Sequence, residues 1–473
     1  MKIAFFEIWN WTPHLETSLE LAHRHLTAGD EVYYYFLGHD VGYKEGLTYK
    51  SPLARWLSRS PERRGAALLS TPRFHFFPRV RLAPARAQWP AMFQSLDELK
   101  QIRYGEFDVG LGVVSSLVHR TRDSDPDLLH HRRLITSMLD SAVSVYAFTR
   151  RRIEQDRPDL VYTFNGRFAN HRAVMRATQH SGVRLLLHER GADRSRYCVR
   201  PFMPHDGKKL QREMIAAWEA AAVDLDAEGV AHRFFRDRRA GREQGWRSFT
   251  SRQRTGTLPK VPADTRVITY FASSDDEYVA VGDIYRWEFW PDQYAAVLDL
   301  IGLCSANPAV TLVIRLHPHL LDKAESDRQR WLSLPRAANV LVVPPESEVD
   351  SYALIEASSI VVTAGSTVGI EAVYWGKPSI NLGPSIYSEL EATYQPKSSD
   401  ELRRLLDSDQ LRVDPRLAYP YGFYMSTFGE KFEAYRPESL FSGEFMGVDL
   451  QRPSPLLSLA LRLRRTTLRW REA

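Results

Sequence analysis

The chain has 473 residues, of which 44% are hydrophobic and 26% are charged, and its formal net charge is +5. This length supports two or three globular domains, each with its own apolar core. No stretch reaches the roughly 18–20 apolar residues that span a bilayer, and the two cysteines, Cys198 and Cys304, have no spacing typical of a zinc site or disulfide framework. The N-terminus reads as a strand and not as a signal peptide, so we expect a cytoplasmic protein. The modest positive charge suits anionic ligands or an anionic surface, and we expect no nucleic acid partner.

The first part of the chain begins with the pattern of a doubly wound α/β domain. A short apolar run predicts a strand at 2–8, leucines at helical spacing predict a helix at 13–28, and a second strand follows at 32–37. This β-α-β opening is the usual start of a Rossmann-like domain, although it lacks the G-x-G-x-x-G motif of a dinucleotide site. For 43–103 we expect short helices and loops, and for 108–116 a strand and a turn.

The same domain is expected to end in further βαβ units, and polar residues follow its last two strands. The pattern predicts helices at 128–153 and 168–180 and strands at 160–164 and 183–187. The residues after these strands are Asn165, Arg167, His188, Glu189 and Arg190. Open α/β sheets bind ligands at the carboxyl ends of their strands, so we expect a ligand site here. The alternative is a simple turn and a solvated ion pair.

A second doubly wound α/β domain follows a polar, helical stretch. The stretch at 204–259 is rich in arginine and is interpreted as an exposed linker. After it, strands alternate with helices, which predicts a second Rossmann-like domain. The strands are predicted at 266–271, 309–316, 340–343, 360–363 and 379–382. We place the boundaries at 1–203, at 204–262 for the helical linker, at 263–430 and at 431–473 for a helical tail.

Three strand-end loops of the second domain are candidates for binding a phosphate. They contain Ser273 and Ser274, then Arg315, His317 and Pro318, then Gly365, Ser366 and Thr367, with Glu371 one turn into the next helix. Small residues before a helix let backbone N–H groups face an anion. A histidine at a strand end can stabilise charge on a departing phosphate, and Glu371 is placed to accept hydrogen bonds from a ribose. The alternatives are an ordinary crossover with a Ser-Thr cap, a capping histidine and a solvated glutamate.

Two such domains suit a transferase for nucleotide-activated substrates, in which one domain holds the nucleotide and the other presents the acceptor. An acceptor hydroxyl needs a general base, and the candidates are Glu7, His14, Glu16 and Glu189. The residues assigned to acceptor binding are Glu16, Asn165, Arg167, His188 and Arg190. The three adjacent acids at 275–277 cannot be told from a solvated loop, so we expect no metal and no cofactor other than the donor.

Two motifs resemble a known family. RLHPH at 315–319 and TAGSTVGIEAVYWGKPSINLG at 363–383 resemble the C-terminal half of the capsule polysaccharide biosynthesis family. That family contains bacterial sugar transferases, including those that use a CMP-activated Kdo donor. PHLET at 13–17, FNGR at 164–167 and HERG at 188–191 are similar to motifs of such proteins. The family is similar in architecture to GT-B glycosyltransferases, which implies two Rossmann-like domains facing across a cleft.

The resemblance implies that His317, Ser366 and Thr367 bind donor phosphate and that Glu371 lies near the nucleotide. It implies a glycosyltransferase that moves a sugar, such as a Kdo-type ulosonic acid from a CMP donor, to a capsule or surface polysaccharide acceptor. The commonest retaining pattern, Glu-x7-Glu, is not met because Thr363 stands eight residues before Glu371, so the stereochemistry stays open. The alternatives are a nucleotide-sugar 2-epimerase and a non-enzymatic carbohydrate- or nucleotide-binding component of an assembly complex.

The segment 456–473 alternates five arginines with leucines and a tryptophan. Such a pattern predicts a basic amphipathic helix on an anionic membrane surface. The alternative is a terminal helix that packs its leucines on the body of the protein. If the segment is an anchor, its deletion will move the protein from the membrane fraction to the soluble fraction of a lysate. An unchanged distribution on ultracentrifugation contradicts the anchor and favours packing.

Overall fold

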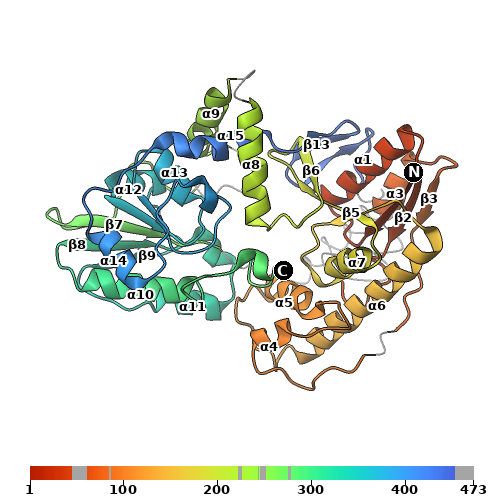
Figure 1. Ribbon diagram of the computed structural model, residues 1–473, viewed down its shortest axis with the longest axis horizontal. Helices are drawn as coiled ribbons and strands as arrows, with labels where there is room; N and C mark the ends of the chain where they lie inside the picture. The colour runs from red at the N-terminus through yellow and green to blue at the C-terminus, as the bar shows by residue number, and fades with distance from the viewer. Residues whose placement is uncertain are drawn as a thin grey trace, which may run out of the picture. The chain divides into compact units, whose positions relative to one another are not determined.

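The computed structural model describes residues 1–44, 61–84, 87–221, 226–242, 244, 252–274 and 278–452. The chain forms two compact units, each built around its own large sheet (Figure 1). The first unit holds 1–116, 128–203 and the chain from 429 onward, and the second holds 117–127 and 204–428. Among the described residues, no helix combines the length and the apolar character that crossing a membrane requires.

The first unit is built on a seven-stranded sheet in the order β12-β6-β5-β4-β1-β2-β3. Strands β1 to β5 are parallel, and β6 and β12 add antiparallel strands at one edge. The parallel part has the doubly wound order 3-2-1-4-5, which confirms the Rossmann-like prediction. The strands are β1 (Lys2–Glu7), β2 (Glu31–Phe36), β3 (Phe74–Phe77), β4 (Leu160–Phe164), β5 (Arg184–Arg190), β6 (Arg196–Arg200) and β12 (Glu430–Lys431).

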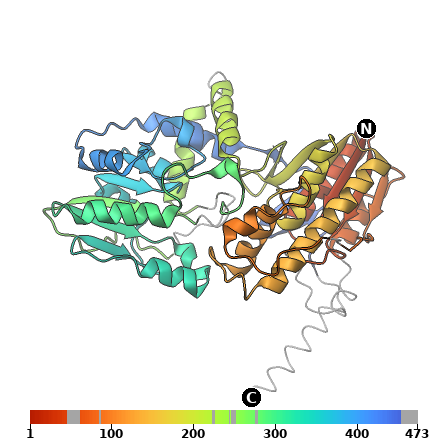
Figure 2. The ribbon, with the colours of Figure 1, turned by 60° about the horizontal axis from the view of Figure 1, so that its bottom comes forward.

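Helices cover both faces of this sheet because successive strand residues point to opposite sides. Phe5 of β1 shares a core with Leu15 and Leu19 of α1, whereas the next residue, Phe6, meets Phe148 of α6 on the other face. Helices α6 and α7 lie side by side (Figure 1 and Figure 2). The helices are α1 (His14–Thr27), α3 (Pro61–Leu68), α4 (Leu96–Lys100), α5 (Val109–Thr121), α6 (Arg132–Asp156) and α7 (Ala169–His180).

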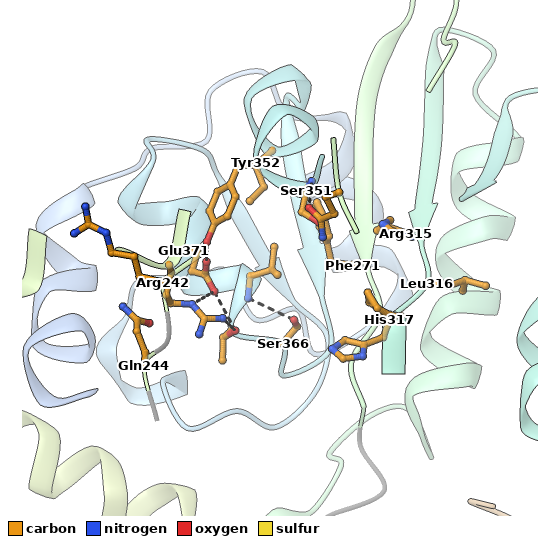
Figure 3. A pocket seen from close by; sticks show the side chains of 17 residues that line it. Arg242, Gln244, Phe271, Arg315, Leu316, His317, Ser351, Tyr352, Ser366 and Glu371 are labelled. Carbon is orange, nitrogen blue, oxygen red and sulfur yellow. Dashed lines mark hydrogen bonds and ion pairs between the residues drawn. The ribbon is translucent and has the colours of Figure 1, made fainter. Parts of the chain in front are cut away.

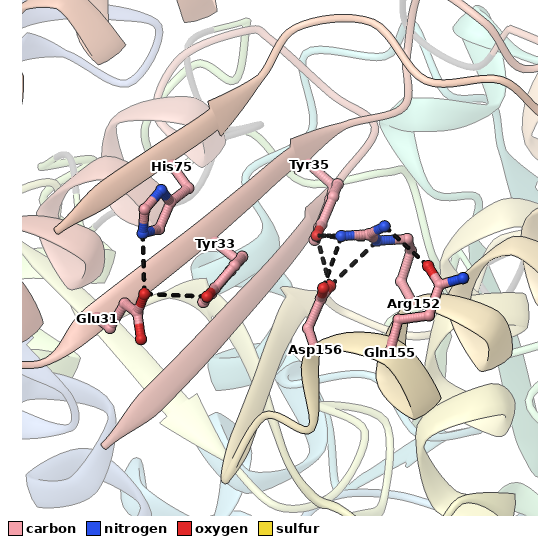
Figure 4. Close-up of polar contacts among 7 residues, drawn as sticks. All are labelled: Glu31, Tyr33, Tyr35, His75, Arg152, Gln155 and Asp156. Atoms are coloured by element: carbon pink, nitrogen blue, oxygen red, sulfur yellow. Dashed lines mark hydrogen bonds and ion pairs between the residues drawn. The ribbon is translucent and has the colours of Figure 1, made fainter. Parts of the chain in front are cut away.

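Polar contacts tie the outer strands of the sheet to one another and to α6 (Figure 4). Tyr35 of β2 donates its hydroxyl hydrogen to Asp156, and Arg152 donates to Asp156 at 2.6 Å and to the Tyr35 oxygen at 2.9 Å. The Arg152 guanidinium also lies over the Tyr35 ring, 5.0 Å from its centre. At the start of β2, Glu31 contacts His75 of β3 at 3.0 Å. These contacts fix α6 on β2 and β2 on β3.

The segments 43–103 and 108–116 of the first unit differ from the sequence prediction. Residues 109–121 form helix α5 and not a strand, although they are rich in valine. Gly110 allows this helix to pack closely, since a Cβ there would lie 1.9 Å from the Leu99 carbonyl oxygen. The region 43–103 contains the edge strand β3, whose four residues are all partly exposed and therefore lack a clear apolar alternation.

The second unit is built on a five-stranded parallel sheet in the order β11-β10-β7-β8-β9. The chain begins at the central strand β7, adds β8 and β9 on one side, and then adds β10 and β11 on the other. This is again a doubly wound order, which confirms the second Rossmann-like domain. The strands are β7 (Arg266–Phe271), β8 (Val310–Arg315), β9 (Val340–Val343), β10 (Ile360–Thr363) and β11 (Ser379–Asn381).

Helices on both faces explain why the strands of the second sheet are apolar throughout. Ile268 and Tyr270 of β7 share a core with α10 and α14, whereas Val267 and Phe271 share another with α12 and α13. Figure 1 shows α10 and α14 on one side of the strands and α12 and α13 on the other. The helices are α10 (Gln293–Ser305), α11 (Glu325–Leu332), α12 (Ser351–Ala357), α13 (Val368–Tyr374) and α14 (Ser399–Asp407).

The predicted linker at 204–262 is part of the second unit, which corrects the expectation of an exposed segment. Its helices α8 (Gly207–Ala221) and α9 (Ala227–Arg239) pack with α15 (Tyr419–Thr427) and α13 around one aromatic core. Phe235 of α9 stacks on Tyr374 of α13 with ring centroids 4.1 Å apart. Because arginines surround Phe235 in the sequence, the composition of the segment predicted an exposed helix.

The chain then returns to the first unit and forms strands, not the predicted helical tail. After β12 comes a hairpin of β13 (Tyr435–Ser439) and β14 (Ser442–Phe445). Glu20 of α1 anchors this segment, because its carboxylate accepts the backbone N–H groups of residues 433–435 at 2.9–3.0 Å. The basic segment predicted as a helix at 456–473 lies outside the described residues.

Replacing Glu20 by Gln will destabilise the first unit. The substitution removes a charged acceptor of three backbone N–H groups, and hydrogen bonds to charged groups contribute about 1.5–3 kcal/mol each. We expect the free energy of unfolding, measured in urea, to fall by about 2 kcal/mol. Glu438→Gln, at an exposed position of the hairpin, is the matched control, and equal losses in the two variants would contradict the anchoring role.

Candidate functional site

The carboxyl ends of three strands lie side by side in the second unit. Phe271 at the end of β7 is in register with Arg315 of β8 and with Thr363 of β10. The strand order reverses at β7, since β8 lies on one side and β10, which comes later in the chain, lies on the other. Open α/β sheets bind ligands at such a reversal point. The loops that follow these strands therefore gather where a ligand is expected.

A cavity of about 140 Å³ opens at this edge of the sheet (Figure 3). Its walls come from the ends of β7 and β8, the turn after β10, and helices α9, α12 and α13. Of the residues predicted to bind a donor, it collects Arg315, His317, Pro318, Ser366, Thr367 and Glu371. Ser273 and Ser274 lie next to it, where they line a smaller cavity of about 30 Å³ together with His317.

A glycine shapes the turn after β10. Gly365 has a φ of +80°, and a Cβ there would lie 2.5 Å from the Pro384 carbonyl oxygen, so a larger residue would displace the backbone. The Gly365 N–H donates to the Asn381 side chain at 2.8 Å. Tyr387 donates to the carbonyl oxygen of Ser366. Contacts from β11 and the chain after it thus hold the Ser366 hydroxyl at the cavity wall.

His317 both caps a short helix and lines the cavity. It precedes the 3-10 helix at Pro318–Asp322, and its Nδ1 accepts the backbone N–H of His319 at 3.1 Å. In the neutral ring this contact leaves the proton on Nε2. Figure 3 shows the ring extending toward the Ser366 side of the cavity. The capping role that was the alternative to a ligand contact is therefore observed, and contact of His317 with a phosphate stays a prediction.

Glu371 is buried in a hydrogen-bond network at the cavity, with 2% of its surface exposed. Its carboxylate accepts hydrogen bonds from Arg238 at 3.0 Å, Tyr352 at 2.6 Å and Thr367 at 3.1 Å (Figure 3). Burial and the charge of Glu371 raise the pKa of Tyr352, which keeps the phenol protonated as a donor. Both carboxylate oxygens thus have protein partners, and contact with a ribose stays a prediction.

Cationic side chains surround the cavity, and two of them were not predicted. Arg238 and Arg242 come from the end of α9 and the residues after it, within the segment interpreted as a linker. Arg315 is buried and donates to the carbonyl oxygens of Pro344 at 2.5 Å and Ser347 at 3.1 Å. Burial lowers the pKa of Arg315 to about 10, so the guanidinium remains charged at neutral pH.

The sequence did contain a signal for Arg238. It stands four residues after Phe234, which is buried, and helix residues at that spacing share a face. Its face of α9 is therefore turned toward the body of the second unit, while 32% of its side-chain surface stays exposed.

The two serines after β7 are engaged in the scaffold. The Ser273 hydroxyl donates to the Ala364 carbonyl oxygen at 2.6 Å, which joins the loops after β7 and β10. Ser274 lies 3.0 Å from Nδ1 of His319. In the described part of the chain no group of three His, Cys, Asp or Glu side chains could hold a metal ion. The acids at 275–277 lie outside the described residues.

The first unit brings together two residues predicted for the acceptor side. Glu7 at the end of β1 contacts His188 of β5 at 2.8 Å, and both side chains are buried. Burial raises the pKa of the Glu7 carboxyl, an effect that the facing His188 reduces. His188, Glu189 and Arg190 lie within β5 and not after it, because the antiparallel pairing with β6 extends the strand. That placement corrects the prediction that the strand ends at 187.

Glu189 belongs to a second polar cluster in the first unit. Asn165, in a left-handed conformation with φ of +52°, donates to one Glu189 oxygen at 2.6 Å. Nδ1 of His14 lies 3.9 Å from the other oxygen. Burial raises the pKa of Glu189, and burial together with the nearby Arg190 lowers that of His14. The Glu189 side chain is 22% exposed against 6% for His14, so it is the more accessible of the two.

The remaining predicted acceptor residues are held by aromatic contacts or by burial. Arg167 lies over the ring of Phe168 at 4.3 Å, and Arg190 over the exposed ring of Phe441 at 4.9 Å. Glu16, a residue of α1, is fully buried in the first unit. Contact of these three residues with an acceptor stays a prediction.

Comparisons with known proteins give a weak likeness to several solved structures, while no family model and no curated protein matches the chain. The β-Kdo 2,4-transferase KpsC of Thermosulfurimonas dismutans is similar at 13% identity, over 56% of this chain and 79% of that one, with a TM-score of 0.37. The UDP-GlcNAc 2-epimerase of Neisseria meningitidis is similar at 12% identity, over 91% and 95%, with a TM-score of 0.27. MurG of Acinetobacter baumannii is similar at 12% identity, over 90% and 95%, with a TM-score of 0.27. Likeness at this level assigns no family or activity, and the fold rests on the strand orders above.

Glu16 gives a pH-dependent prediction. Burial raises its pKa from 4.5 to about 7, although a hydrogen bond from Thr12 favours the charged form and opposes this shift. A raised pKa in the folded state contributes stability that is complete below pH 4.5 and is lost as the pH rises through about 7. Glu16→Gln removes that loss, so at pH 8 we expect the free energy of unfolding to rise by about 2–3 kcal/mol. At pH 4.5 we expect little change, and an equal gain in urea titrations at both pH values would contradict the assignment.

Proposed function

We propose that the chain is a glycosyltransferase that transfers a sugar from a nucleotide-activated donor to a glycan or glycolipid acceptor. The observation that supports this proposal most strongly is the cavity at the strand-order reversal of the second unit. Two arginines, Arg238 and Arg315, line it together with the imidazole of His317 and the hydroxyl groups of Ser366 and Thr367. This combination suits the phosphate of a nucleotide better than it suits a neutral metabolite.

In the proposed reaction the bond between the anomeric carbon and the donor phosphate breaks, and the nucleotide leaves with the electron pair. Negative charge then grows on the phosphate oxygen. His317 supplies an Nε2–H donor and the arginines supply fixed positive charge, which stabilise that oxygen in the transition state. Helix α13 has only seven residues, so these side chains contribute more than its dipole.

The acceptor hydroxyl forms the new bond to the anomeric carbon and gives up its proton. We propose that Glu189 accepts this proton as the general base, since burial raises its pKa and so makes its carboxylate a stronger base. Glu7 is a weaker candidate because it is 2% exposed and already contacts His188. His14 is a weaker candidate because its pKa is lowered by burial and its side chain is nearly closed to solvent.

The donor that we propose is a CMP-linked ulosonic acid of the Kdo type, and the product a capsule or surface polysaccharide. This finer assignment rests on the resemblance of the motifs at 315–319 and 363–383. A 2-epimerase is the second candidate, because the Gly-x-Glu-Ala segment at Gly369–Ala372 is similar in that class. The third is a component that binds a nucleotide sugar and converts nothing.

Replacing His317 by Ala will lower turnover by on the order of 10²–10³, the loss typical of a donor that stabilises transition-state charge. The purified protein is incubated with CMP-, UDP- and GDP-sugars in the presence and absence of an acceptor mixture, and free nucleotide is measured. Release stimulated by the acceptor supports transfer, whereas an isomerised nucleotide sugar supports the epimerase.

His75→Ala is the matched control, because His75 lies on the outer strand β3 of the first unit and contacts Glu31. We expect it to keep wild-type turnover. Binding of a nucleotide sugar without any conversion contradicts the enzymatic proposal. Equal turnover in the wild type and in His317→Ala contradicts the role of the histidine alone.

A further inference from the structure

The second unit has another cavity, of about 300 Å³, that the proposed reaction does not use. Its walls are the segment 283–290, the chain after β11 and the start of α8. It shares no lining residue with the cavity beside Glu371. Tyr285 separates the two, because its hydroxyl donates to the Pro384 carbonyl oxygen at 2.7 Å, directly behind Gly365.

Aromatic rings form one wall of this second cavity. In the sequence YRWEFW at 285–290, four of six residues are aromatic. Phe289 is 48% exposed, and its ring meets that of Trp290 edge-on at 4.7 Å. Trp290 is buried and donates its indole N–H to Asp299 at 3.0 Å. Trp287 lies against Gly383 behind this wall, where a Cβ would lie 2.6 Å from its ring. An exposed ring is thus held on a fixed aromatic base.

The polar lining is balanced in charge. Three acidic and three basic side chains contribute to it, namely Asp283, Glu288, Glu389, Lys208, Arg286 and Lys397. A phosphate would meet three carboxylates here, and a purely apolar ligand would leave six charged groups without solvent. A hydroxyl group both donates and accepts, so a ligand rich in hydroxyls can use both kinds of side chain.

We infer that this cavity is a carbohydrate-binding subsite for a neutral sugar ring. The C–H face of the ring packs on Phe289, and its hydroxyls bond to side chains such as Arg286 and Glu288. The volume of about 300 Å³ lies at the lower end of small-molecule sites, which matches one or two sugar rings. The subsite does not depend on the transfer reaction, because it shares no residue with the cavity proposed to hold the donor.

The test is saturation-transfer NMR on the full-length protein with four disaccharides as probes: lactose, maltose, cellobiose and N,N′-diacetylchitobiose. We expect transfer to at least one of them. Phe289→Ala should weaken that binding at least tenfold, and because the side chain is half exposed the fold should survive. Arg286→Gln is the second variant, and it should weaken binding through the hydroxyl contacts while leaving the aromatic wall intact.

Two controls separate this inference from the proposed function. Leu298→Ala removes a similarly exposed apolar side chain on α10 and should leave the disaccharide signal unchanged. His317→Ala should also leave it unchanged, even where it abolishes turnover. No signal from any of the four probes, or a signal equal in the wild type and in both Phe289→Ala and Arg286→Gln, would overturn the inference. Binding of inorganic phosphate that Arg286→Gln abolishes, with no sugar signal, would replace it by an anion site.

Discussion

The buried carboxylate of Glu371 is the constraint on which the site of the second unit depends. An ionised carboxylate that is removed from water is tolerated only when charge and hydrogen bonds compensate it. Arg238 and Tyr352 provide that compensation, at 3.0 Å and 2.6 Å. Arg238 comes from α9 and Tyr352 from α12. Because both must reach the carboxylate on α13, the three helices meet at the same edge of the sheet. The cavity wall follows from that arrangement, and Arg242 and Arg315 add positive charge to it.

Much of the fold could be predicted from the sequence because the strands of both sheets are short apolar runs separated by helical patterns. The strand at Ile360–Thr363 and the turn at Gly365 are examples, since β-branched residues and a glycine leave few other conformations. Prediction failed where a contact distant in sequence decides the conformation. Residues 433–435 are held at α1 by Glu20, which lies more than 400 positions earlier and accepts their N–H groups.

The candidate site was predicted in part for the same reason. Strand-end residues such as His317 and Ser366 could be placed because parallel strands end at one edge. Arg238 was missed, because its role depends on which face of α9 is buried, and the surrounding arginines gave that helix the composition of an exposed segment. In the first unit, the pairing of Glu7 with His188 joins two strands that the sequence separates by 181 positions. No local pattern indicates that contact.

The return of the chain after residue 428 has a consequence for biosynthesis. The first unit needs Tyr435 and Phe445 in its core, and these residues leave the ribosome after the whole of the second unit. Domains usually fold in the order in which they are made, but here the unit that starts first is completed last. At a synthesis rate of roughly 5–20 residues per second, the early strands wait more than ten seconds for their final partners. During that interval the edge beyond β6 has no strand to pair with, and the Glu20 carboxylate of α1 lacks the backbone donors that it finally holds.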